Sequence, residues 1–157
     1  MDITTWLVRR CHQTYRKGNW AGKGVLSALK GVTAEMAHWR PHPEQHTIAE
    51  IALHMGYWKD SVTAGLTRKP WTHDKELDWR SPAPTEQGWQ EALTELQRAH
   101  NRLTKALRGL KPARLMQPLQ PRRRLSVADL VVDIATHDSY HSAQIFVLRR
   151  LFHTKKI

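Results

Sequence analysis

Two histidines, His137 and His141, stand four residues apart on the predicted buried stripe of a C-terminal helix. Residues at this spacing lie one turn apart on the same helix face, so both imidazoles can converge on one ion. The rest of the stripe consists of Leu130, Ile134, Gln144, Leu148 and Leu151. Two histidines in such a stripe favour a metal site over two core histidines that bond carbonyl groups.

A third ligand could come from His54, at the edge of the apolar stripe of another predicted helix, beside Ile51 and Trp58. Three neutral imidazoles with one or more open positions are the ligand set of a catalytic metal centre. Zinc and nickel suit these ligands best, and manganese and iron stay open. The predicted site is therefore one divalent metal ion on His54, His137 and His141.

The segment 137–141 reads HDSYH and is similar to the zinc-protease motif HExxH, with aspartate in place of glutamate. Asp138 is one carbon shorter than the glutamate that acts as the base in that motif. No edge strand is predicted on which a peptide could lie. Chemistry on a small molecule is therefore preferred over peptide hydrolysis.

Other polar residues have open roles. His100 could be a fourth ligand, a substrate contact or a satisfied core histidine, and the last is preferred. Asp133 lies one turn before His137 and could orient its imidazole, although such a carboxylate more commonly faces solvent. Tyr140 and Gln144 either line the pocket or only pack. The remaining histidines are predicted to be surface residues: His12, His38, His42, His46, His73 and His153.

The elements that must position these side chains are predicted to be helices, without a convincing strand. One helix begins at Thr47, which forms a capping box with Glu50, and ends near Leu66. Another begins near Thr85 and stops at Gly109. Its stripe consists of Trp89, Leu93, Leu96, His100, Leu103, Leu107 and Leu110.

The C-terminal helix begins at Ser126, which forms a second capping box with Asp129. The N-terminal helix is expected from about Ile3 to Lys30, with a kink or break at residues 18–24, where three glycines interrupt it. Four helices of this kind predict an all-α, four-helix bundle.

The connections 33–45 and 68–84 are rich in proline, and Trp71 and Trp79 of the second are expected to pack over the bundle end. The 157 residues are predicted to form a single domain, 1–157. One cysteine, Cys11, excludes an intrachain disulfide. With no signal peptide or membrane-spanning run, the expected location is the cytoplasm.

The formal charge of +11 makes nucleic acid or another polyanion a partner to test. However, Arg98, Arg102 and Lys105 lie opposite the apolar stripe of their helix, as on a solvated face. The cluster Arg122, Arg123 and Arg124 lacks interleaved aromatic residues. Nucleic acid is therefore the least favoured partner, and the charge could equally attract acidic small molecules.

Two segments, residues 45–54 followed by Trp58 and residues 137–145 followed by Arg149 and Arg150, resemble the paired motifs of DinB/YfiT-like proteins. They read QHTIAEIALH and HDSYHSAQI, and residues 25–41 are similar to the first helix and turn of that family. The resemblance implies a mirror variant of the up-and-down four-helix bundle, the three histidines as metal ligands, and commonly a homodimer. Seven tryptophans, some of which could be interfacial, agree with a dimer.

Family members with assigned chemistry include transferases for low-molecular-weight thiols such as bacillithiol or glutathione and a mycothiol-dependent isomerase, while many other members are only called metal-dependent hydrolases. The leading hypothesis is therefore a hydrolase or thiol S-transferase whose metal ion activates water or a substrate thiolate. The alternatives are a non-catalytic metal- or ligand-binding stress-response module and, less favoured, a polyanion binder.

Overall fold

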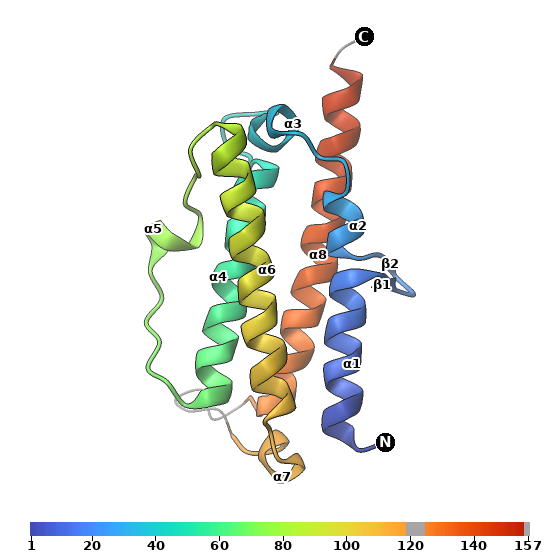
Figure 1. Cartoon of the computed structure of the whole chain (residues 1–157), viewed down its shortest axis with the longest axis vertical. Helices are drawn as coiled ribbons and strands as arrows, with labels where there is room; N and C mark the ends of the chain where they lie inside the picture. Colours follow the sequence, from blue (N-terminus) through green and yellow to red (C-terminus); the bar gives the residue numbers. More distant parts are fainter. Residues whose placement is uncertain (119–124, 156–157) are drawn as a thin grey trace.

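Four long helices stand side by side in the structure, a computed structural model that describes residues 1–118 and 125–155 (Figure 1). Helix α4 packs against α6 and α8, and α1 packs against the same two helices. The predicted all-α, four-helix bundle is confirmed. The elements are α1 (Ile3–Arg16), β1 (Gly18–Asn19), β2 (Gly22–Lys23), α2 (Val25–Leu29), α3 (Ala34–His38), α4 (Ile48–Thr67), α5 (Lys75–Asp78), α6 (Glu86–Arg108), α7 (Pro112–Leu115) and α8 (Val127–Thr154).

Both predicted capping boxes are confirmed at the starts of α4 and α8. The Thr47 hydroxyl accepts the Glu50 N–H at 3.1 Å, and the Glu50 carboxylate accepts the Thr47 N–H at 2.9 Å. Ser126 and Asp129 do the same at the start of α8. These side chains satisfy N–H groups that a helix start leaves without partners, so local sequence determines where the two ligand-bearing helices begin.

The predicted break in the N-terminal helix is a small antiparallel hairpin of β1 and β2, which the sequence did not predict. Gly18 has a φ of +106°, and a Cβ there would lie 2.1 Å from the carbonyl oxygen of Gly22. Only glycine fits this turn. The Asn19 amide donates to the Ser139 hydroxyl at 3.0 Å, which anchors the hairpin to α8.

The buried face of α8 differs from the predicted stripe by about one residue. Asp138 lies in it at 1% exposure, whereas Leu151 is 42% exposed. The predicted stripe did not include Asp138 and wrongly included Leu151, whereas Ile134, His141 and Leu148 are buried as predicted. The buried residues of the helix are Val127, Val131, Ile134, Asp138, His141, Ser142, Ile145, Leu148 and Phe152.

A buried ion pair explains how an aspartate can occupy the core. Lys59 on α4 has no exposed surface, and its ammonium donates to both Asp138 oxygens at 2.5 and 2.6 Å. The pair lies between two apolar clusters, one with Ile145 and the other with Val131. A buried charge is tolerated only with such a partner, so the pair joins α4 to α8 in one register.

The same layer contains His100, which is buried in the core as preferred from the sequence. It is not fully satisfied, because its Nδ1 has no hydrogen-bond partner among the described residues. Its ring stacks on Tyr15 with centroids 3.7 Å apart, and its Nε2 faces the Nδ1 of His12 at 3.1 Å. Burial lowers the pKa of His100 to about 3, and the Lys59 charge adds to this. The prediction that His12 is an ordinary surface residue was wrong, because it is partly buried and bonded to His100.

The connection 68–84 runs along the outside of α4 and carries α5 (Figure 1). Trp79 stacks on His54, and Trp71 contacts Tyr57 edge-on, both on the flank of α4. The prediction that these tryptophans pack over the bundle end was therefore wrong.

The charged face of α6 is confirmed, since Arg98, Arg102 and Lys105 are exposed. The cluster Arg122, Arg123 and Arg124 lies outside the described residues. Within residues 1–118 and 125–155, no helix combines the length and the apolar character that crossing a bilayer requires.

Removing one member of the buried pair is expected to destabilise the fold strongly. Lys59→Met or Asp138→Ala should each lower the free energy of unfolding by about 3–5 kcal/mol, because each leaves an unpaired buried charge. The matched control is the exposed pair of Arg102 and Asp60, where Arg102→Ala should cost at most about 1 kcal/mol. Urea denaturation measures both. Equal losses for the buried and the exposed pair would contradict this account.

Candidate metal centre

Three imidazoles meet between α4 and α8. His54 projects from α4, and His137 and His141 project from successive turns of α8. The Nε2 atom of His137 lies 3.1 Å from Nε2 of His54 and 3.0 Å from Nε2 of His141. Their ligand atoms all lie within 4.8 Å of one another. The structure therefore brings together the three histidines that the sequence predicted as a set.

The outer nitrogens of two of these rings are oriented by hydrogen bonds. The Nδ1 of His54 lies 2.6 Å from the Asp78 carboxylate, which only accepts, so this nitrogen carries the proton. The Nδ1 of His141 lies 2.6 Å from the Gln144 side-chain oxygen and donates to it in the same way. A neutral imidazole has one N–H, so both rings turn a bare Nε2 lone pair toward His137.

These lone pairs create a conflict that a cation resolves. His137 has one Nε2 atom for two facing lone pairs and can donate a proton to only one of them. Its Nδ1 is buried and has no partner among the described residues. A metal ion between the three Nε2 atoms would turn every one of these contacts into a favourable one. The residues present therefore fit a bound ion.

The histidines are also in the protonation state that metal binding needs. Burial lowers the pKa of His137 to about 3, with smaller contributions from His141, His54 and Lys59. Burial lowers the pKa of His141 to about 4 and also lowers that of His54, against the opposing effect of Asp78. All three rings are therefore neutral near pH 7, and no proton has to leave a ring nitrogen before an ion binds.

The carboxylate that orients a ligand comes from an unexpected place. Asp133, predicted as a candidate, is exposed on α8. The carboxylate that orients a ligand ring is Asp78, which lies in the connection after α4. It is buried and also accepts a hydrogen bond from Nε2 of His73 at 3.0 Å. The prediction of His73 as an ordinary surface residue was therefore incomplete. A cluster of acids at residues 74–78 within a proline-rich connection was the only sequence signal for Asp78.

Aromatic rings cover the cluster on the side of this connection. Trp79 stacks on His54 with ring centroids 3.6 Å apart. It also stacks on His46, again with centroids 3.6 Å apart. The edge of Trp58 also faces His54. His46, predicted as a surface residue, is thus part of the wall. These rings shield the imidazoles from water, which strengthens electrostatic interactions at the site.

A cavity of about 470 Å³ is lined by both Tyr140 and Gln144; none of the three histidines lines it, and Gln144 connects it to the cluster. Gln144 bonds His141 through its oxygen and donates to the Tyr140 hydroxyl at 3.0 Å through its nitrogen. The cavity also contains His46 and apolar residues of α8, among them Val147 and Leu148. Its size is that of pockets that bind small organic molecules.

These features define a helical-bundle protein with a three-histidine site between two of its long helices. A family model described as the DinB superfamily matches residues 19–145. The chain therefore belongs to the DinB superfamily, as the two motifs indicated. No curated protein and no solved structure matches it.

The orientation of His54 by Asp78 can be tested through metal affinity. Asp78→Asn should weaken binding of zinc or nickel by about 10–100-fold, because a neutral amide orients the ring less firmly and lowers its basicity. The control is Glu76→Gln, which makes the same charge change at an exposed position of α5. Competition with a chromogenic chelator measures both dissociation constants. Equal affinity in the two variants would mean that Asp78 has no such role.

Proposed function

We propose that the protein binds one divalent metal ion through Nε2 of His54, His137 and His141 and acts on a small molecule as a metal-dependent enzyme. The observation that carries this proposal is the convergence of three neutral imidazoles, two of which have their outer nitrogens held by Asp78 and Gln144. An ion held by three neutral ligands retains its full charge and supplies Lewis-acid chemistry, including a lowered pKa for a bound water or thiol. Zinc and nickel are the first candidates, followed by manganese and iron.

The surrounding acids favour transfer of a thiol over hydrolysis. Asp78 accepts from two histidines, and Asp138 is paired with Lys59. Neither is available as the general base that a hydrolytic water commonly needs. A thiol depends less than water on a general base for its deprotonation, because its ordinary pKa is already close to neutral. On this ground we rank thiol S-transferase above hydrolase, and Glu44 and His46, which line the cavity, are the residues to test as a base for the hydrolytic alternative.

The protein's own cysteine does not serve as that thiol. Cys11 is buried between α1 and α8, and its Sγ donates to the Val131 carbonyl at 3.9 Å. Burial raises the pKa of this thiol to about 11, so it stays protonated near pH 7. The thiol has to be a second substrate. The cavity beside Gln144 and Tyr140 has room for a molecule of that size.

A second candidate function is the non-catalytic module, which would use the same three histidines only to hold an ion or a ligand. The homodimer also stays a prediction. Exposed apolar side chains on α8 would be covered in it, including Tyr140, Val147 and Leu151.

Elemental analysis of tag-free protein, expressed without added metal, tests the proposal. We expect near-stoichiometric metal in the native protein and none in His137→Ala/His141→Ala. The control His42→Ala/His153→Ala removes two exposed histidines and should retain the ion. Absence of metal from every sample, before and after titration, would overturn the proposal.

The loaded protein is then assayed with thiol-transfer and hydrolytic substrates. Turnover that is lost in His137→Ala/His141→Ala identifies the enzyme, and stable metal without turnover of either class supports the non-catalytic module. Light scattering on the same samples gives the oligomeric state, and a monomer mass would end the dimer prediction.

A further inference from the structure

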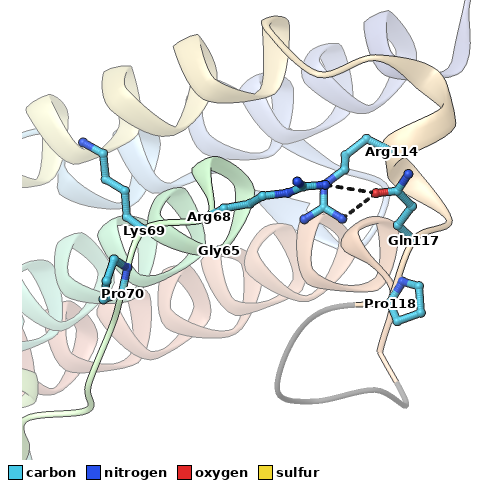
Figure 2. A pocket seen from close by; sticks show the side chains of 7 residues that line it. All are labelled: Gly65, Arg68, Lys69, Pro70, Arg114, Gln117 and Pro118. Carbon is cyan, nitrogen blue, oxygen red and sulfur yellow. Dashed lines mark hydrogen bonds between the residues drawn. The ribbon is translucent and has the colours of Figure 1, made fainter.

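A second pocket lies at the opposite end of α4 from the metal centre. It has a volume of about 630 Å³ and is formed where α4 ends and α7 leads towards α8 (Figure 2). Arg68 follows His54 by fourteen residues, which corresponds to about 20 Å along a helix axis. The pocket is therefore distinct from the metal centre, and its polar lining consists of Arg68, Lys69, Arg114 and Gln117.

Two guanidinium groups converge in this pocket on one neutral oxygen. The Gln117 side-chain oxygen accepts from Arg114 at 2.8 Å and from Arg68 at 3.4 Å (Figure 2). Arg40, Arg80 and Arg102 each bond a carboxylate, and Arg149 bonds backbone carbonyl oxygens, whereas Arg68 and Arg114 share one side-chain amide oxygen. A carboxylate is the strongest partner for a guanidinium group. The side chain of Gln117 has the shape of a glutamate side chain but carries no charge.

The positive charge of the pocket is therefore not neutralised by the protein. Within residues 1–118 and 125–155, no aspartate or glutamate lines it and no carboxylate is paired with Arg68, Lys69 or Arg114. Arg68 and Lys69 are exposed and Arg114 is half-buried, so solvent weakens the repulsion between these like charges without removing it. An anion between them would remove that repulsion.

The backbone of Arg68 is also unusual for an arginine. Its φ of 58° and ψ of 30° are left-handed, and it is the only non-glycine residue with a positive φ in the part of the chain that the structure describes. Glycine is preferred in this conformation at a helix end, because a Cβ is strained there. An arginine at this position gives up backbone stability while placing its guanidinium beside Gln117.

We propose that this pocket binds the phosphate group of a phosphorylated small molecule. Arg68 and Arg114 would donate paired N–H groups to the phosphate oxygens, and Lys69 would add a point charge. The volume exceeds what one phosphate group needs, so the pocket has room for the organic part of the ligand. A single-stranded nucleic acid is the weaker choice, because none of the described residues that line the pocket is aromatic and could stack a base.

Inorganic phosphate and pyrophosphate are the probes for a first calorimetric titration, at constant ionic strength maintained with chloride. We expect saturable 1:1 binding that Arg68→Gln/Arg114→Gln weakens at least tenfold. The control Arg98→Gln/Arg108→Gln removes the same charge from the exposed face of α6 and should change affinity less than twofold. Equal weakening by both variants, or no saturable binding by either anion, would overturn the proposal.

Two single variants separate binding from folding. Gln117→Glu places a fixed carboxylate between the guanidinium groups, so the thermal midpoint should rise while phosphate affinity falls at least tenfold. Arg68→Gly relieves the left-handed strain, so the midpoint should stay or rise while affinity falls. Undiminished phosphate binding in a folded Gln117→Glu protein contradicts the proposal. The proposal is also contradicted if a short oligothymidylate binds in this pocket and neither phosphate nor pyrophosphate shows saturable binding.

Discussion

The buried ion pair of Lys59 and Asp138 constrains the bundle at the level of the three histidines. Asp138 lies between His137 and His141 on α8, and Lys59 lies on the same helix as His54. A charge without exposed surface needs its partner at hydrogen-bond distance, which excludes sliding or rotation of α4 against α8. The contact that stabilises the helix pair therefore also holds the imidazoles in one arrangement.

The site combines this rigid frame with an oriented shell of hydrogen bonds. Asp78 and Gln144 determine which nitrogens of His54 and His141 are bare, and burial keeps the rings neutral. The Nε2 of His137 faces the bare Nε2 atoms of both other rings and can donate a proton to only one of them. A cation between the three rings would satisfy all three nitrogens, and this is the physical reason to expect an ion here.

The sequence predicted the features that depend on local chemistry. The capping boxes at Thr47 and Ser126 placed the starts of the two ligand-bearing helices, and the four-residue spacing placed His137 above His141. Asp78 was not found, because it reaches His54 across an irregular connection with no periodicity. The burial of Asp138 was missed for a related reason, since it depends on Lys59, 79 residues away in the chain.

X-ray absorption at the metal edge of the zinc-loaded protein tests the central claim most directly, because it reports the ligand atoms themselves. The account predicts a first shell of nitrogen and oxygen at about 2.0–2.1 Å, with the multiple scattering of three imidazoles and no sulfur. A sulfur shell near about 2.3 Å, or scattering from fewer than two imidazoles, would contradict it.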